Sequence, residues 1–137
     1  MSRTVAQHVT EATIYGFCLD PSGTFLFTTC RNDIRVWDLN KLISIGKLSG
    51  NHDSNDELSC IAVSFDAGKK GRLISGSKKA GLIGLYDINL NNSIDGSEAR
   101  GCPINYQQTH GHVTSLFCYD RSGYAAFRDG VTFNIIF

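Results

Sequence analysis

The sequence lacks any excess of charge and any long apolar run. Its 13 Lys and Arg residues balance its 13 Asp and Glu residues, so the formal net charge at pH 7 is zero. Without an overall field, nothing steers the chain to nucleic acid or to an anionic membrane. No apolar run approaches the roughly 20 residues that cross a bilayer. The polar residues 1–13 also contain no apolar signal core. These absences predict a cytoplasmic protein with no nucleic-acid partner and no membrane insertion.

Closely spaced cysteine pairs are also missing. The five cysteines form no C-x-x-C pair, and most lie in apolar, strand-like runs. We therefore expect reduced thiols that pack as small apolar side chains. Zinc is one alternative, because four candidate ligands lie near one another in sequence: Cys102, His110, His112 and Cys118. Structural zinc needs ligand pairs at short spacing from two segments. A single His-x-His does not supply them, so we predict no metal.

Catalytic motifs are absent as well. Residues 71–78 read GRLISGSK, but a phosphate-binding loop requires Gly-Lys before its Ser or Thr. Here Gly76 is followed by Ser77, and the segment is predicted to be a strand. Nucleophilic catalysis needs a base and an oxyanion hole, and no G-x-S-x-G turn is present. We predict no enzymatic activity and no cofactor, which leaves an enzyme subunit as the least supported class.

What the sequence does contain is a hairpin pattern at residues 24–38, TFLFTTCRNDIRVWD. β-Branched and aromatic residues suit a pleated, half-buried surface. The Arg-Asn-Asp between the two halves favours a turn, because Asn and Asp side chains bond to the nearby backbone. The hairpin ends on Trp37-Asp38, a dipeptide typical of propeller blades.

Strand patterns then recur along the chain. After an N-terminal extension at residues 1–13, the first unit covers residues 14–48. The second covers residues 58–109 and includes a long polar loop at 89–103. The third, residues 111–137, is incomplete. The array predicts an all-β fold of about two and a half four-stranded antiparallel blades.

A strand followed by a turn marks the start of each unit. The three segments are CLDPSG at 18–23, SFDAG at 64–68 and CYDRSG at 118–123. Their aspartates are 46 and 54 positions apart, near the period of roughly 40–45 residues of a WD repeat. Because a propeller needs roughly four to eight blades, we expect the chain to be a fragment or a shortened variant, with open blade edges that drive association.

These units resemble WD40 repeats. Gly111-His112 matches the start of the family pattern, with His112 as the blade histidine and His110 solvated. Ser75-Gly76-Ser77 matches the second strand, and Trp37-Asp38 the third. In the family, a His, a Ser or Thr, an Asp and a Trp link strands by hydrogen bonds. No unit here keeps all four, so we expect the blades to depend on apolar packing.

A more specific resemblance covers roughly residues 14–90. The runs LDPSGTFLF, IRVWDL, GKLSG, LISGSK and LYDI resemble the carboxy-terminal WD40 domain of kinesin-4 class kinesin-like proteins. The resemblance implies a non-catalytic tail module, without a motor, that contacts microtubules or cargo partners at cytoplasmic or cytoskeletal sites. The alternative is a WD40 adaptor or scaffold of an unrelated complex, such as a ubiquitin ligase or a signalling assembly.

One basic cluster is a candidate partner-binding site. It consists of Lys69, Lys70, Arg72, Lys78 and Lys79. We place these residues at two turns flanking one strand, with Arg72 and Lys78 on a shared face because they lie six residues apart. The functional interpretation is a basic rim for an acidic partner, with tubulin tails as one candidate. The alternative is a set of solvated lysines that protect sheet edges.

Overall fold

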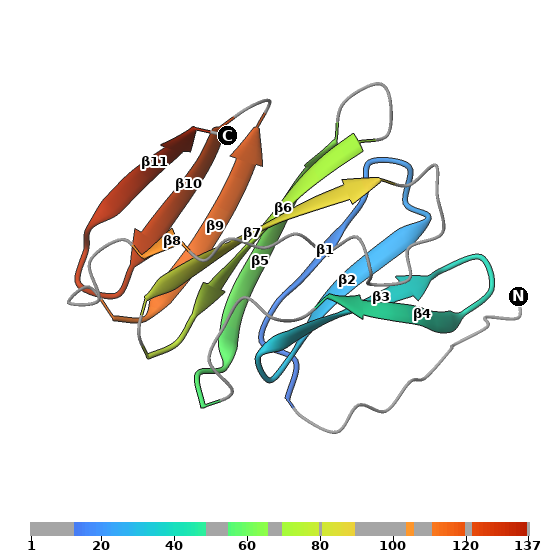
Figure 1. The fold of residues 1–137 in the computed structure, drawn as a ribbon, viewed down its shortest axis with the longest axis horizontal. Coiled ribbons are helices and arrows are strands. Elements are labelled where there is room, and N and C mark those ends of the chain that lie inside the picture. The colour runs from blue at the N-terminus through green and yellow to red at the C-terminus, as the bar shows by residue number, and fades with distance from the viewer. Residues whose placement is uncertain are drawn as a thin grey trace, which may run out of the picture.

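The computed structural model describes residues 13–48, 55–65, 70–79, 81–89, 104–105, 111–119 and 122–136. These residues form three antiparallel sheets, which we call blades 1, 2 and 3 (Figure 1). The all-β fold class is therefore confirmed. The predicted loop at 89–103 lies outside the described residues, apart from its first residue.

Blades 1 and 2 each contain four strands in sequence order, and blade 3 contains three in the described part of the chain. Blade 1 consists of β1 (Phe17–Leu19), β2 (Phe25–Cys30), β3 (Asp33–Asp38) and β4 (Ile43–Leu48). Blade 2 consists of β5 (Leu58–Phe65), β6 (Lys70–Ser77), β7 (Leu82–Asn89) and β8 (Ile104–Asn105). Blade 3 consists of β9 (Val113–Tyr119), β10 (Ser122–Phe127) and β11 (Thr132–Ile136).

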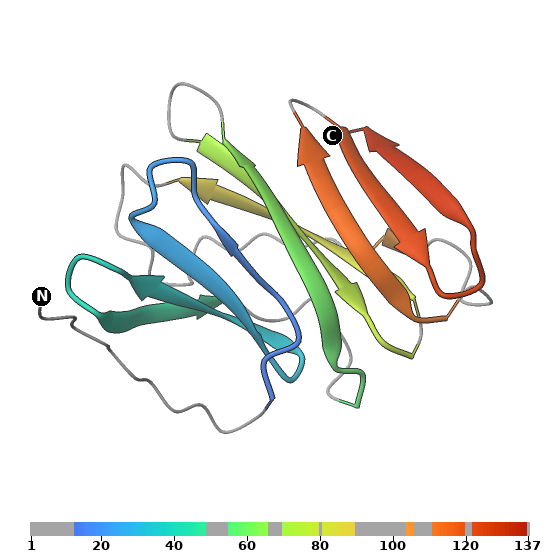
Figure 2. The same cartoon turned by 180° about the vertical axis from the view of Figure 1, so that it is seen from behind.

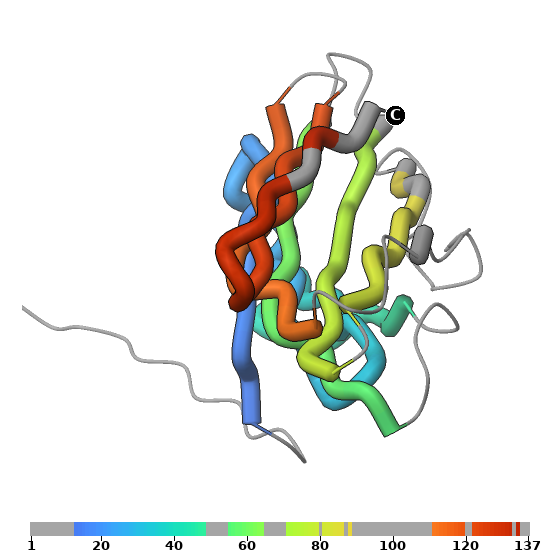
Figure 3. The backbone as a smooth tube through the Cα atoms, turned by 90° about the vertical axis from the view of Figure 1, so that its left-hand side faces the viewer, coloured from blue at the N-terminus to red at the C-terminus, as the bar shows by residue number. Residues whose placement is uncertain are grey.

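The first strands of the three blades, β1, β5 and β9, lie side by side (Figure 2). The side view shows these strands together on one side, with β6 and β7 set back from them (Figure 3). The blades are thus stacked as neighbours, as expected for a repeat fold in which each unit contacts the next.

Two apolar clusters hold the stack together. The first joins blades 1 and 2, with Phe27 and Val36 packed against Leu73 and Tyr86. The second joins blades 2 and 3, with Ile74 and Ile83 packed against Val113, Ala125 and Phe127. Strand alternation explains both, because successive residues of β6 face opposite sides of the sheet. Blade 2 therefore has both of its faces covered.

Buried polar groups organise the first blade. The carboxylate of Asp20 accepts hydrogen bonds from the backbone N–H groups of Ser22 at 3.1 Å and Phe25 at 2.7 Å, which fixes the β1–β2 turn. The indole Nε1 of Trp37 donates to Oγ1 of Thr28 at 2.9 Å. Apolar packing is therefore supplemented by side-chain hydrogen bonds that the sequence pattern did not identify.

The repeat alignment based on the Cys-x-Asp segments is wrong in one respect. Cys18 packs into the cluster between blades 1 and 2, and so faces the following blade. Cys118 packs into the cluster between blades 2 and 3, and so faces the preceding blade. Equivalent residues of a repeat face the same way, so Cys18 and Cys118 are not equivalent. A shift of one residue along a strand reverses the face.

Candidate partner-binding site

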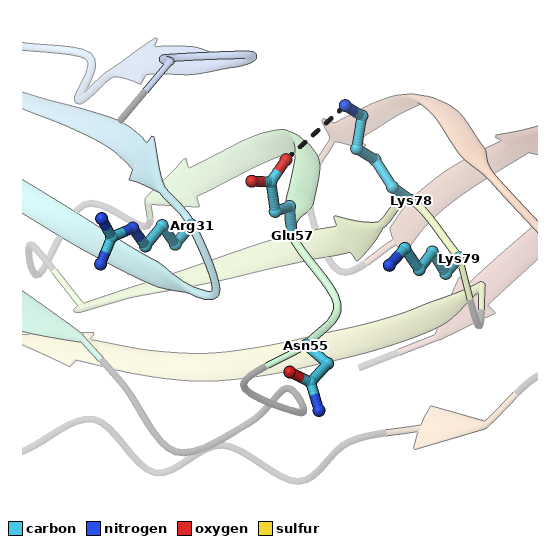
Figure 4. A pocket seen from close by; sticks show the side chains of 5 residues that line it. All are labelled: Arg31, Asn55, Glu57, Lys78 and Lys79. Atoms are coloured by element: carbon cyan, nitrogen blue, oxygen red, sulfur yellow. Dashed lines mark ion pairs between the residues drawn. The ribbon is translucent and has the colours of Figure 1, made fainter. Parts of the chain in front are cut away.

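A pocket of about 340 Å³ opens where the turns of blades 1 and 2 meet. We call it the cationic pocket, and it is lined by Arg31, Asn55, Glu57, Lys78 and Lys79. Its walls come from the β2–β3 turn, the segment before β5 and the turn after β6 (Figure 4). Three of the five lining residues are cationic and one is acidic, so the pocket favours an anionic ligand.

Backbone hydrogen bonds bring these three segments together. The N–H of Leu58 donates to the carbonyl of Arg31 at 2.7 Å, which joins the blade 1 turn to blade 2. The N–H of Lys78 donates to the carbonyl of Glu57 at 2.9 Å. Arg31 adopts a left-handed conformation with φ of 55°, which closes the tight turn between β2 and β3.

A buried carboxylate positions the second lysine. Asp56 is 4% exposed, and its Oδ1 accepts a hydrogen bond from the backbone N–H of Lys79 at 2.8 Å. This bond fixes the turn after β6 through its backbone and leaves the Lys79 side chain exposed. In Figure 4, the Lys79 ammonium points toward the middle of the pocket.

Lys78 lies between an aromatic ring and a carboxylate. Its Nζ is 3.6 Å from the centroid of the Tyr15 ring and 3.7 Å from Oε2 of Glu57. A hydrogen bond with Tyr15, supported by the charge of Glu57, raises the pKa of Lys78 above 10.5. Lys78 therefore carries a full positive charge at neutral pH, and Glu57 offsets part of it.

The five basic residues predicted from sequence do not all line this pocket. Lys78 and Lys79 do, in the turn after β6, as expected. Because β6 ends at Ser77, Lys78 does not share a strand face with Arg72. Lys70 begins β6 at the opposite end, and an eight-residue strand is about 23 Å long from first to last residue. Arg72 is exposed near that far end. Lys69 lies outside the described residues.

Three pocket residues were missed by the sequence analysis as partner-binding candidates. Arg31 was assigned only to a turn, and Asn55 was not considered. Glu57, which forms an ion pair with Lys78, was not among the candidates. The sequence does predict the turns on which these residues lie. It does not predict that the turns lie close together, because that depends on how two blades pack.

The other candidate groups can be placed only in part. Cys102 and His110 lie outside the described residues, and residues 71–77 belong to strand β6 (Lys70–Ser77). Within the described ranges, no three His, Cys, Asp or Glu residues gather as metal ligands. Burial raises the pKa of the Cys18 and Cys118 thiols to about 12. Among the described residues, no helix is long and apolar enough to cross a membrane.

Comparison with solved structures defines the class of protein. The crystal structure of the RRP9 WD40 repeats matches with a TM-score of 0.64 at 14% identity, covering 87% of this chain and 34% of that chain. The structure of U3-55K matches equally well, at 13% identity. The chain is therefore a partial WD40 β-propeller.

Sequence comparison narrows the resemblance. Human kinesin-like protein KIF21A is 38% identical over 87 residues, which cover 64% of this chain and 5% of the relative. Human KIF21B is 30% identical over 77 residues, covering 56% of this chain and 4% of the relative. The klp-12 protein of Caenorhabditis elegans is 25% identical over 120 residues, covering 87% of this chain and 7% of the relative. No protein-family model matches. This WD40-repeat chain thus resembles kinesin-like proteins, as the sequence predicted.

Proposed function

We propose that this chain is a non-catalytic protein-interaction module whose cationic pocket binds an acidic segment of a partner protein. The observation that carries the proposal is that Arg31, Lys78 and Lys79 line one pocket between two blades. Loops held by a rigid β scaffold commonly carry recognition. The proposal retains two residues of the predicted basic cluster and adds Arg31.

The size of the pocket fits a side chain better than a folded domain. At about 340 Å³ it is near the lower end of ligand pockets, which span roughly 300–1,000 Å³. A Glu or Asp carboxylate entering it meets the Lys79 ammonium and competes with Glu57 for Lys78. The lining cations are largely exposed, so we expect affinity to fall as salt rises.

The similarity to kinesin-like proteins supports microtubules or cargo proteins as the partner class, at a cytoplasmic or cytoskeletal location. The acidic tails of tubulin provide the carboxylates that the pocket requires, and they are our first candidate. A WD40 adaptor in an unrelated complex is the second candidate, and it would bind acidic segments without binding microtubules.

The test is a binding titration of the full 137-residue chain with a fluorescent oligo-glutamate peptide, paired with microtubule co-sedimentation. The pocket variant is R31Q/K78Q/K79Q, which we expect to weaken both interactions at least tenfold. K41Q/K47Q/R128Q is the charge-matched control, because these three cations are exposed and lie outside the pocket.

Additional arms separate the possible outcomes. K69Q/K70Q/R72Q tests the remote end of the predicted cluster and should leave binding unchanged if the pocket is the site. Equal binding by the pocket variant and the wild-type chain would refute the pocket. Microtubule binding that persists after the tubulin tails are removed would refute the tubulin-tail assignment alone.

A further inference from the structure

In the part of the chain that the structure describes, each of the outer blades has one exposed apolar face, and neither face belongs to the cationic pocket. In blade 3, Phe117, Tyr119 and Tyr124 are 60%, 72% and 47% exposed. Register pairs Tyr124 with Phe117, so both lie on the side away from blade 2, with ring centroids 6.5 Å apart. We call this set the blade-3 outer face.

Blade 1 has a corresponding surface on its opposite side. Phe17 is 69% exposed and Leu19 is 48% exposed, whereas Cys18 between them faces blade 2. Register places Leu26 and Trp37 on the same side as Leu19. These four residues form the blade-1 outer face.

The repeat itself indicates what should cover the blade-1 outer face. Three apolar residues near the start of each blade share one spacing, in which the second follows the first by three residues and the third follows the second by two. They are Leu58, Ile61 and Val63 in blade 2, Val113, Leu116 and Cys118 in blade 3, and Ile14, Phe17 and Leu19 in blade 1. In blades 2 and 3 this set packs against the preceding blade. In blade 1 the set is 42% to 69% exposed. The complementary surface is therefore the following side of another blade, which is the face that a blade turns toward the next blade in the chain.

Among the described residues, the blade-3 outer face is the uncovered following side that could supply this contact. We propose that the blade-3 outer face of one copy packs on the blade-1 outer face of a second copy, and the reverse, to give a closed two-fold ring. Three blades from each copy make six, within the range of roughly four to eight that closes a propeller. The contact is heterologous and occurs twice around the axis.

Arg35 lies on the same side of blade 1, and its guanidinium suits an occupant with aromatic rings. Arg35 pairs in register with Thr28, which pairs with Phe17, so all three share the outer side of blade 1. The Nε of Arg35 is buried and has no hydrogen-bond partner among the described residues. Because this atom is closed to a second copy, the contact that Tyr119 and Tyr124 offer is a ring face for the outer part of the guanidinium.

The first measurement is the solution mass of the full chain by light scattering. The chain weighs 15.0 kDa, so the closed ring should weigh about 30 kDa. Trp37 is the single tryptophan and lies on the blade-1 outer face. Its emission should shift to the blue as the ring forms with rising concentration. A monomer at all accessible concentrations would overturn the proposal.

Two single variants test the geometry of the contact. F17S and F117S should each yield monomers with wild-type circular dichroism, because both side chains are exposed in the single chain. I43S is the matched control, since Ile43 is 49% exposed and lies outside both outer faces. The control should keep the mass of the dimer. Retention of the dimer by either F17S or F117S would contradict the model of the ring.

Mixing the two variants separates a heterologous contact from a symmetric one. In an F17S–F117S pair, both mutations fall at one junction and the other junction is wild type. The mixture should therefore recover dimer that neither variant forms alone. If copies instead paired blade 1 with blade 1, F117S would dimerise without a partner variant, and the proposed ring would be wrong.

Discussion

The ammonium of Lys78 lies 3.6 Å from the centroid of the Tyr15 ring, so a residue that precedes the first strand supports a turn of the second blade. The contact crosses between blades and fixes one cation at the edge of the pocket. Tyr15 is itself held in place, because its backbone N–H donates to Oγ1 of Thr29 at 3.0 Å. The pocket is therefore a product of inter-blade packing.

Replacing Tyr15 with leucine should lower the pKa of Lys78 toward its ordinary value of 10.5, because the hydrogen bond with Tyr15 is the largest cause of the increase. NMR titration of the Lys78 side chain measures the change. Y15F retains the ring and loses the hydroxyl, and so should show an intermediate value. An unchanged pKa in Y15L would contradict the role assigned to Tyr15.

Replacing Glu57 with glutamine should strengthen binding of an acidic peptide by about twofold to fivefold, the scale of one exposed ion pair. The reason is that Glu57 pairs with Lys78 at 3.7 Å and competes with an entering carboxylate. Fluorescence anisotropy measures the affinity. D129N is the charge-matched control, because Asp129 is exposed and not part of the pocket lining. Equal gains in both variants would indicate a general charge effect.

Replacing Gly76 with alanine should destabilise the junction of blades 2 and 3 by about 1–3 kcal/mol. A Cβ at this position would lie 2.5 Å from Cγ1 of Val113, which is fully buried. Denaturant unfolding gives the free energy. Adding V113A should relieve the clash, so the two substitutions should be less costly together than the sum of their separate effects. Additive effects would show that the close approach is not the cause.

Stability should fall as pH rises from 9 toward 12, because three thiols keep their protons in the folded state. Burial raises the pKa from 9.0 to about 12 for Cys18 and Cys118, and to about 11 for Cys60. The unfolded chain releases these protons near pH 9, so each thiol costs at most about 1.4 kcal/mol per pH unit above that value. Below pH 9 the contribution is fully present.

Unfolding midpoints measured across this range test the thiol effect. Lysines and tyrosines titrate in the same interval, so the comparison is with C18A/C60A/C118A. That variant will be less stable at neutral pH, but its stability should decline more gently above pH 9. Parallel declines in the two proteins would rule out the thiols as the source.

Local patterns predicted the blades better than they predicted the pocket. The hairpin at residues 24–38 could be identified because its alternation and its turn are encoded in adjacent residues. The run LYDI at residues 85–88 was also identified as part of the second unit, and its Tyr86 is fully buried. That Arg31 and Lys79 line one pocket could not be predicted, because this depends on packing between blades that no local spacing encodes.

The comparison of Cys18 with Cys118 shows a second limit. Both precede an aspartate by two residues, and the two segments are similar in sequence. The register of β1 against β2 and of β9 against β10 places them on opposite sides of their sheets. Register is fixed by which face a neighbouring blade covers, and this information lies outside either segment.

The position of blade 2 between two apolar clusters has a consequence for how the chain opens. In the single chain, its strands can be exposed only after a neighbour detaches, whereas blades 1 and 3 can each separate from one side. The backbone amides of β6, whose Leu73 and Ile74 face opposite clusters, should therefore exchange with deuterium more slowly than those of β3 or β10. We therefore expect blades 1 and 3 to unfold first and blade 2 to unfold last.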